Sequence, residues 1–363
     1  MGFKILSIYP TVAATRIALF DEEKEIKRVE LRHDPCDLLD AVTSEKQYDI
    51  RRTAVEKLFG GWISGADNIE AVIGCALLPS GMSSGVYLLD GEFSKKMRIT
   101  RVEGRVINYG ALLASFIARE MGARAFAMVP FESDEMDVIA RISGVPGLCF
   151  GRLTHTLQIK NALRLAACDL KKPQNELSFV MAYLGHNFSF CSHRNGRIKD
   201  HSNTFERGPF SPARSGSLPA AEVIRMAYSG MWSKIDLMER AYYSGGLLSY
   251  TGAPDGDIDA VISRMEEGDV YSSLLIRAMA YQIASEIAAQ AVVLKGRVDA
   301  IVFSGSCMEN RIFAEMLREK ISWISSKILT YRGEDELAMI SDGALRVLRN
   351  EETPRSCGAF SSK

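Results

Sequence analysis

The segment from Leu177 to His201, LSFVMAYLGHNFSFCSHRNGRIKDH, contains three strand patterns in close succession. A β-rich apolar run ends at Leu184 and is followed by the turn Gly185 to Asn187, after which Phe188 to His193 forms a second run. Asn-Gly is a strong signal for a two-residue hairpin turn, so Asn195-Gly196 predicts a third strand that returns antiparallel. The segment therefore predicts a three-stranded meander.

The same pattern occurs at the start of the chain. Lys4 to Ile8, Thr15 to Phe20 and Glu25 to Leu31 read as strands separated by two short turns. A chain of 363 residues is long for one hydrophobic core, and two copies of one unit predict two domains. We expect a first domain over 1–148, a second over 149–337, and a last helix within 338–363 that returns to the first.

Each copy is followed by helical patterns and single apolar strands, which predicts an α/β fold with mixed sheets covered by helices on both faces. The segments concerned are the helices Asn108 to Met121, Tyr271 to Leu294 and Arg311 to Ile321 and the strands Ala71 to Ile73, Ala125 to Val129 and Val298 to Phe303. A cleft between two such halves would suit a small ligand. A symmetric scaffold without chemistry is the alternative, because duplication alone does not name a ligand.

Composition excludes several classes of partner. The formal net charge of −1 gives no basic surface for nucleic acid or an anionic membrane. No apolar run approaches the roughly 18 residues that a membrane span needs, and no signal peptide is predicted. The seven cysteines are scattered without a Cys-x-x-Cys pair, which favours a reducing cytoplasm. Small solutes and protein partners remain.

Several motifs resemble those of butyrate kinases, relatives of acetate kinase in the actin-like and sugar-kinase superfamily. The resemblance extends from Lys4 to about Leu348, and its most specific words are DEM at 134–136, ARISGVP at 140–146, GPFSP at 208–212, RSG at 214–216, AMAYQIA at 278–284, LKG at 294–296 and DGALRVL at 342–348. It implies two duplicated ribonuclease-H-like domains. It also implies transfer of the γ-phosphoryl group of ATP to a short-chain carboxylate, with Mg²⁺, in a homo-oligomer.

The resemblance assigns catalytic roles to two residues. His155 matches a histidine that hydrogen-bonds the transferring phosphoryl group, and Arg214 matches an arginine that stabilises transition-state charge. A lone histidine is more often structural, and an arginine on its own more often forms a surface ion pair. The family words around both residues favour the functional interpretation, with both side chains facing one cleft.

Other positions match the nucleotide and metal sites of the family. Gly305 and Asn310 match the loop that carries the nucleoside, and Asp255 flanks the adenosine pocket, although Asp257 replaces the arginine expected nearby. Glu334 and Glu336 cover the position of a glutamate that holds Mg²⁺ through water. A solvated acidic turn is the alternative for these two carboxylates.

Two turns depart from the family pattern. The first turn, Tyr9 to Arg16, lacks the glycine and most of the hydroxyl groups that bind phosphate in relatives, and only Thr15 and the charge of Arg16 remain. The second turn, Leu184 to Asn187, keeps Gly185 alone of three glycines. We expect Thr15, Arg16 and Gly185 to be what is left of the phosphate contacts.

Two single substitutions affect the chemistry more directly. Cys75 replaces the arginine that contacts the carboxylate substrate, and Val129 replaces the aspartate that serves Mg²⁺ and the nucleophile. Neither residue can take over the role of the one it replaces. Two hypotheses therefore stay open, a butyrate-type kinase of weak activity and a catalytically impaired paralogue that acts as a nucleotide-binding or partner subunit. Altered substrate choice is a third.

Overall fold

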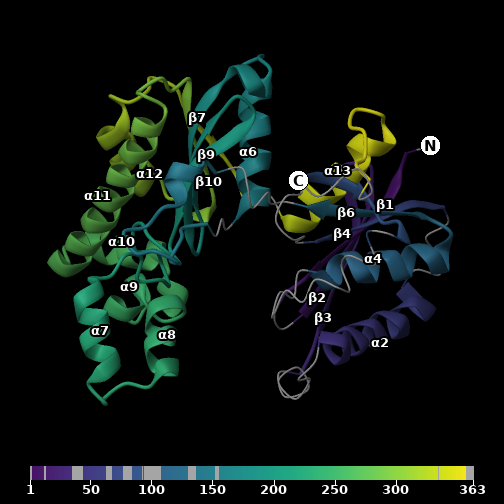
Figure 1. The fold of residues 1–363 in the computed structure, drawn as a ribbon, viewed down its shortest axis with the longest axis horizontal. Helices are drawn as coiled ribbons and strands as arrows, with labels where there is room; N and C mark the ends of the chain where they lie inside the picture. Colours follow the sequence, from purple (N-terminus) through teal and green to yellow (C-terminus); the bar gives the residue numbers. More distant parts are fainter. Residues whose placement is uncertain are drawn as a thin grey trace. The chain divides into compact units, whose positions relative to one another are not determined.

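A computed structural model of the protein divides the chain into two compact units (Figure 1). Unit 1 comprises Met1–Asp134 and Glu334–Lys363, and unit 2 comprises Glu135–Gly333. The residues that the structure describes are 2–11, 14–34, 44–62, 68–76, 84–91, 93, 108–129, 136–151, 155–333 and 335–356.

Unit 1 contains a six-stranded sheet with the strand order β3-β2-β1-β4-β6-β5. β1, β2 and β3 form an antiparallel meander, β4 and β6 continue parallel to β1, and β5 is antiparallel to β6. The strands are β1 (Lys4–Pro10), β2 (Ala14–Asp21), β3 (Lys24–Arg32), β4 (Ile69–Cys75), β5 (Gly85–Leu88) and β6 (Arg124–Val129). The predicted N-terminal meander is confirmed.

Helices cover both faces of this sheet because alternate strand residues are apolar. Ile17 and Leu19 of β2 belong to the core beneath α4 (Asn108–Met121), whereas Ala18 and Phe20 pack with Leu337 of α13 (Glu336–Leu348). A further helix, α2 (Ser44–Trp62), places Val55 in the same core as α4.

Unit 2 contains a five-stranded sheet with the order β11-β10-β7-β8-β9. The strands are β7 (Ser178–Leu184), β8 (Phe188–Arg194), β9 (Arg197–Asn203), β10 (Ala300–Ser304) and β11 (Ile328–Tyr331). A meander, β7 to β9, is again extended by two strands parallel to its first strand. Because β3-β2-β1-β4-β6 of unit 1 has the same connectivity, the predicted duplication of an α/β unit is confirmed.

The two faces of the second sheet are covered by different helices (Figure 1). Phe179 and Met181 of β7 pack against α6 (Thr156–Asp169), and Val180 and Ala182 face α11 (Val270–Val293) and α12 (Arg311–Ile321). Shorter helices lie between β9 and α11: α7 (Ala220–Tyr228), α8 (Lys234–Tyr242), α9 (Gly246–Thr251) and α10 (Ile258–Glu266). One more helical turn, α5 (Val138–Arg141), precedes α6.

Candidate active site

His155 is held at the head of α6 by its backbone conformation and by two side-chain contacts. Its backbone has φ 58° and ψ 30°, a left-handed conformation that is uncommon for a residue with a side chain. Its Nδ1 lies 2.9 Å from the hydroxyl oxygen of Ser189 on β8. Its ring stacks on Tyr183 of β7, with the ring centroids 4.4 Å apart and the planes 26° from parallel. The imidazole is therefore fixed in both position and plane.

The imidazole of His155 is neutral at physiological pH. Burial, together with the positive charge of Arg214, lowers its pKa to about 3. A neutral imidazole offers one N–H donor and one nitrogen acceptor. The influence of Arg214 also means that the two predicted catalytic residues act on each other within unit 2.

Arg214 presents a cation in a poorly solvated position. Its guanidinium carbon lies 3.5 Å from the ring centroid of Phe205, and Nη1 donates to the hydroxyl of Thr204 over 3.4 Å. Nε is buried and has no hydrogen-bond partner in the described part of the chain. Burial lowers the pKa of Arg214 to about 10, which still leaves it charged at neutral pH.

The segment that carries Arg214 is rigidly connected. The backbone N–H of Ser211 donates to the carbonyl of Arg214 over 2.9 Å, and the Arg214 N–H donates back to the Ser211 hydroxyl over 3.2 Å. Gly216 has φ 65°, and a Cβ there would lie 2.5 Å from the carbonyl oxygen of Pro209. The family words at 208–216 thus describe a tight double turn that fixes the backbone of Arg214.

Two glycine turns meet at the ends of β7 and β10. Gly305 has φ 108°, and a Cβ at this position would lie 2.4 Å from the carbonyl carbon of Leu184. A Cβ at Gly185 would lie 2.6 Å from the hydroxyl of Tyr183, the residue whose ring stacks on His155. The thiol of Cys307 donates to the carbonyl of Gly185 over 3.3 Å. The structure therefore places Gly185 and Gly305 together and connects them to His155 through Tyr183.

Asn310 begins α12 and uses its side chain within the fold. Its Oδ1 accepts the backbone N–H of Phe313 over 3.0 Å, and its Nδ2 donates to Asp259 of α10 over 2.7 Å. Asp255 lies in the short 3-10 turn Pro254–Gly256, and its side chain is outside the described residues. The nucleoside roles of Asn310 and Asp255 stay predictions.

Thr15, in unit 1, has its hydroxyl enclosed by protein. The residue is fully buried, with Oγ1 2.8 Å from Nε2 of His33 and accepting a hydrogen bond from Nη1 of Arg51 over 3.1 Å. Arg51 comes from α2, is itself fully buried, and also donates to the carbonyls of Thr11 and Ala14, each over 2.9 Å. A phosphate contact by Thr15 would have to displace these partners.

Sequence reasoning missed Arg51 and His33. The adjacent residues Arg51 and Arg52 are both basic, and the sequence does not indicate that either is buried. An arginine in a helix points inward only when the fold provides hydrogen-bond acceptors for it. The charge of Arg16, by contrast, lies on the surface, where it pairs with Glu30 of β3 over 3.0 Å. The phosphate roles of Thr15 and Arg16 stay predictions.

Cys75 and Val129 lie at the ends of β4 and β6, where both are buried. Burial raises the pKa of the Cys75 thiol, so the side chain is a neutral, apolar group. Tyr9 is half-buried and packs beside Leu337 of α13. These three side chains fill space in unit 1.

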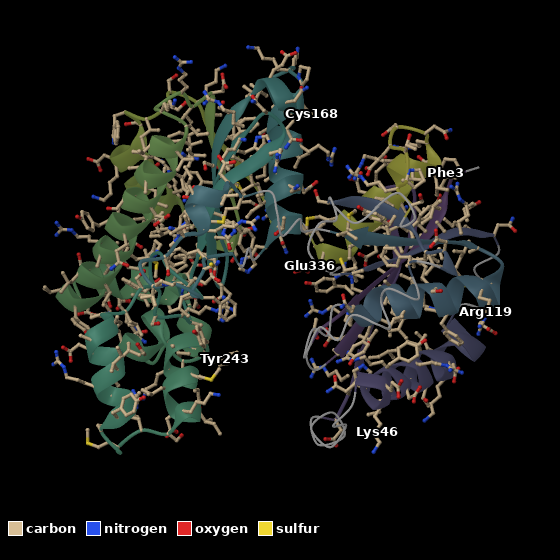
Figure 2. All side chains as sticks on the ribbon, viewed as in Figure 1. Phe3, Lys46, Arg119, Cys168, Tyr243 and Glu336 are labelled. Atoms are coloured by element: carbon tan, nitrogen blue, oxygen red, sulfur yellow. The ribbon has the colours of Figure 1, made fainter. Side chains whose placement is uncertain are left out.

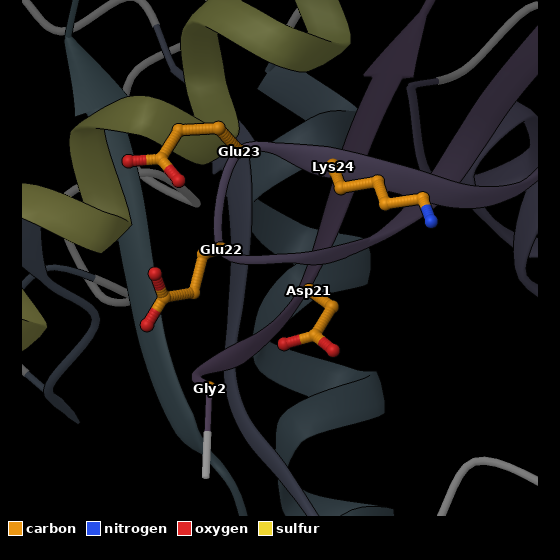
Figure 3. Close-up of a pocket in the computed structure, with 5 residues that line it drawn as sticks. All are labelled: Gly2, Asp21, Glu22, Glu23 and Lys24. Carbon is orange, nitrogen blue, oxygen red and sulfur yellow. The ribbon is translucent and has the colours of Figure 1, made fainter.

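Glu334 and Glu336 are the carboxylates predicted to serve a metal ion. Glu334 lies outside the described residues, and Glu336 is the first residue of α13. Across the described ranges, no group of three or more histidine, cysteine, aspartate or glutamate side chains could hold a metal ion. A hollow of about 700 Å³ is lined by Gly2 and the turn 21–24 (Figure 3), but Arg349 already pairs with two of its carboxylates. That hollow contains none of the predicted site residues.

Comparison with known proteins identifies relatives over nearly the whole chain. The model of the acetokinase family matches residues 157–332. The chain is 34% identical to a probable butyrate kinase 2 of Caldanaerobacter subterraneus subsp. tengcongensis, over 98% of this chain and 100% of that protein. It is 32% identical to butyrate kinase 2 of Clostridium acetobutylicum, over 97% and 98% of the two chains.

Solved structures agree on the fold. Acetate kinase from Porphyromonas gingivalis superposes with a TM-score of 0.78 at 16% identity, covering 95% of this chain and 100% of that one. A propionate kinase from Francisella tularensis gives a TM-score of 0.71 at 15% identity, covering 94% and 98%. Among the described helices, none is long and apolar enough to cross a membrane. Taken with the duplicated α/β fold and the full-length relatives, these matches show that the chain belongs to the butyrate kinases of the acetokinase family.

Proposed function

We propose that this protein transfers the γ-phosphoryl group of ATP to a short-chain carboxylate of the butyrate type, giving ADP and an acyl phosphate. The observation that carries the proposal is the state of Arg214. Its guanidinium is partly buried with Nε unpartnered, and within the described residues no carboxylate forms an ion pair with it. A desolvated cation without a countercharge is stabilised by an anion, and a transferring phosphoryl group is one.

The two residues supply complementary interactions to such a group. Arg214 provides positive charge near the equatorial oxygens, where charge is spread in the transition state. His155, kept neutral by burial and by Arg214, provides a hydrogen-bond donor without adding a second charge. Both are preorganised, because the ring is stacked and the arginine backbone is fixed by its turn. Little reorganisation is then needed during transfer.

ATP would bind at the glycine turns of unit 2 in this proposal. The two glycines pack against each other and against Leu184 and Tyr183, and the backbone N–H groups of these turns are the proposed contacts for phosphate or ribose oxygens. Asn310 and Asp255 are the candidates for contacts to the nucleoside. Magnesium would enter with the nucleotide, held by phosphate oxygens and water. Bound Mg²⁺ would neutralise phosphate charge.

Turnover is proposed to be weak because the family's arginine and aspartate are replaced at two buried positions, 75 and 129. Cys75 and Val129 are buried and uncharged, so neither can contact a carboxylate or a metal ion. The loss of one such contact commonly lowers turnover by about 10² to 10³. A nucleotide-binding or partner subunit without turnover is the alternative, and the full-length butyrate kinase relatives support the kinase over it.

A coupled assay of ADP release tests the proposal. It uses the full chain with ATP, Mg²⁺ and a panel of carboxylates from acetate to valerate, with the unrelated acceptor glucose as control. We expect slow, carboxylate-dependent ADP release that is greatest near butyrate. ATP binding in calorimetry without release for any carboxylate would establish the alternative, and absence of both would overturn the proposal.

We also propose a cytoplasmic homo-oligomer. All residues of α7 and α8 are exposed or half-buried, although several are large and apolar. Tyr228 is 88% exposed, Met231 78% and Ile235 76%, and Tyr243 at the end of α8 is 68% exposed (Figure 2). An apolar surface of this kind is typical of a protein interface. Light scattering after size exclusion would give the mass, and a 40.1 kDa monomer at all concentrations would contradict the proposal.

A further inference from the structure

Ser189 is a buried hydroxyl whose contact with His155 has a chemical consequence. It lies on β8 opposite Asn203, is fully buried, and places Oγ 2.9 Å from Nδ1 of His155. Both the strand and the ring are fixed, so the contact does not depend on a mobile side chain. A hydroxyl at this distance can either donate to Nδ1 or accept from it.

The two directions of this hydrogen bond correspond to two forms of the neutral ring. If Ser189 donates, Nδ1 is unprotonated and the proton of the imidazole resides on Nε2. If Ser189 accepts, the proton resides on Nδ1 and Nε2 carries a lone pair. Nε2 has no hydrogen-bond partner within the described part of the chain. The choice at Ser189 thus determines what His155 presents at its other nitrogen.

The expected ligand, a phosphoryl group, decides between the two forms of the ring. A phosphoryl oxygen accepts hydrogen bonds, so a lone pair on Nε2 would repel it, whereas an Nε2–H would bind it. Tyr183 stacks on one face of the ring and prevents the ring from turning over to exchange its nitrogens. Phosphoryl transfer is therefore served by the neutral ring that carries its proton on Nε2. This form requires a hydrogen-bond donor facing Nδ1.

We propose that Ser189 is a positioning residue that donates its hydroxyl proton to Nδ1 of His155 and so presents Nε2–H to the transferring phosphoryl group. The proposal rests on the proposed function for the identity of the acceptor. The direction of the hydrogen bond is a property of the resting protein and can be measured without turnover.

Nitrogen-15 NMR of the full chain, labelled at histidine, tests the direction. Protonated and unprotonated ring nitrogens have well-separated resonances, and the signals absent from His155→Gln assign those of His155 among the five histidines. We expect an unprotonated Nδ1 and a protonated Nε2 at pH 7. In Ser189→Ala we expect this preference to decrease or reverse. A protonated Nδ1 in the wild type, or an unchanged preference in Ser189→Ala, would overturn the proposal.

Kinetics provide the second measurement. Ser189→Ala should lower kcat about tenfold to a hundredfold with KM for ATP changed less than about twofold, as for other residues that orient a catalytic group. Ser189→Cys, which keeps a weak donor of similar size, should recover part of the loss. An unaltered kcat in Ser189→Ala beside measurable wild-type turnover would contradict the proposal.

Ser192 provides a matched control on the same strand. It is also fully buried, but within the described residues its hydroxyl forms hydrogen bonds only with the backbone of Asp200, over 3.1 and 3.4 Å. Ser192→Ala should leave the His155 resonances unchanged and kcat within about twofold. If the wild type shows no kinase activity, the proposed function fails, while the NMR result still decides how Ser189 sets the ring.

Discussion

The first turns of the two duplicated units have the same place in the fold and opposite chemical character. In unit 1 the turn after β1 is closed by protein, because the buried Arg51 donates to Thr11, Ala14 and Thr15. In unit 2 the turn after β7 keeps Gly185, which lies against Gly305 without a side chain from either residue. One arginine of this protein is thus used for the fold, and another, Arg214, is left without a countercharge.

The difference shows that duplication preserves connectivity more strictly than chemistry. Both units keep a meander extended by two parallel strands, since the hydrophobic faces require it. The residues of a polar turn at the end of a strand are less constrained by packing. The hydrogen-bonding groups of such a turn can be paired either by a ligand or by other residues of the protein. Substitutions in the two units should distinguish a turn that binds a ligand from a turn that is paired within the protein.

Arg214→Gln should lower kcat by about a thousandfold, because it removes the desolvated positive charge at the proposed phosphoryl site. Arg214→Lys should recover little, since a lysine cannot lie flat over Phe205 and reach the same oxygens. Arg16→Gln tests the phosphate role predicted for unit 1; because this cation pairs with Glu30 at the surface, the substitution should lower kcat by less than about tenfold.

Steady-state assays and thermal unfolding measure this comparison. The unfolding free energy of Arg214→Gln should fall by no more than about 1 kcal/mol, the size of a cation–π contact. Equal losses of kcat in Arg214→Gln and Arg16→Gln would remove the contrast between the units.

Arg51→Met should lower the unfolding free energy by about 3 kcal/mol, because three acceptors in the first turn would lose their donor in a buried position. Arg52→Met is the control at the next residue. Arg52 is 44% exposed in its side chain and pairs with Glu56 one helical turn later, which contributes about 0.3–0.5 kcal/mol. Urea unfolding of both variants gives the difference, and a similar small effect for each would show that the turn does not depend on Arg51.

Gly305→Ala should be about 2 kcal/mol more destabilising than Gly268→Ala, and it should also weaken binding of ATP. Both glycines have positive φ, 108° and 96°, so both substitutions introduce backbone strain. Only at Gly305 would the new Cβ meet backbone, 2.4 Å from the carbonyl carbon of Leu184, whereas nothing lies within 4 Å at Gly268. Calorimetry with a non-hydrolysable ATP analogue and urea unfolding would measure both effects, and equal behaviour would exclude close packing of the two turns.

The meanders were predictable because their evidence is local. Alternating or continuous apolar runs and the Asn195-Gly196 turn determine the strands, and β8 and β9 follow the predicted ranges closely. The resemblance also led to His155 and Arg214, since Arg214 lies within a specific family word and His155 matches a family position. What surrounds them was not predictable. Ser189, Tyr183 and Phe205 come from separate strands and loops, and nothing in their spacing indicates which ring they touch.

The burial of Arg51 illustrates the same limit for a charge. Helical periodicity gives no reason to place an arginine inward, and its acceptors lie 36 to 40 residues away in sequence. Long-range polar contacts depend on the packed fold, so pattern reasoning assigns such a residue to the surface.

The smallest expected effect is a change in the pH dependence of stability, measured in each unit through a buried histidine. Burial lowers the pKa of both His33 in unit 1 and His201 in unit 2 from 6.5 to about 4. Between these values the unfolded chain binds a proton that the folded chain does not, so stability decreases as the pH falls from 6.5 towards 4. Above pH 6.5 both states carry neutral imidazole, and the contribution of each histidine to the slope vanishes.

His33→Gln and His201→Gln should each reduce this slope by about 1.4 kcal/mol per pH unit near pH 5.5, whatever they do to stability at pH 7. Urea unfolding between pH 5 and 7.5 measures the slope. If the two units unfold separately, His33→Gln should alter only the transition of unit 1 and His201→Gln only that of unit 2. A single transition whose slope falls equally in both variants would instead show that the units unfold together, and a slope unchanged in either variant would mean that its histidine is already protonated, or solvated, in the folded protein.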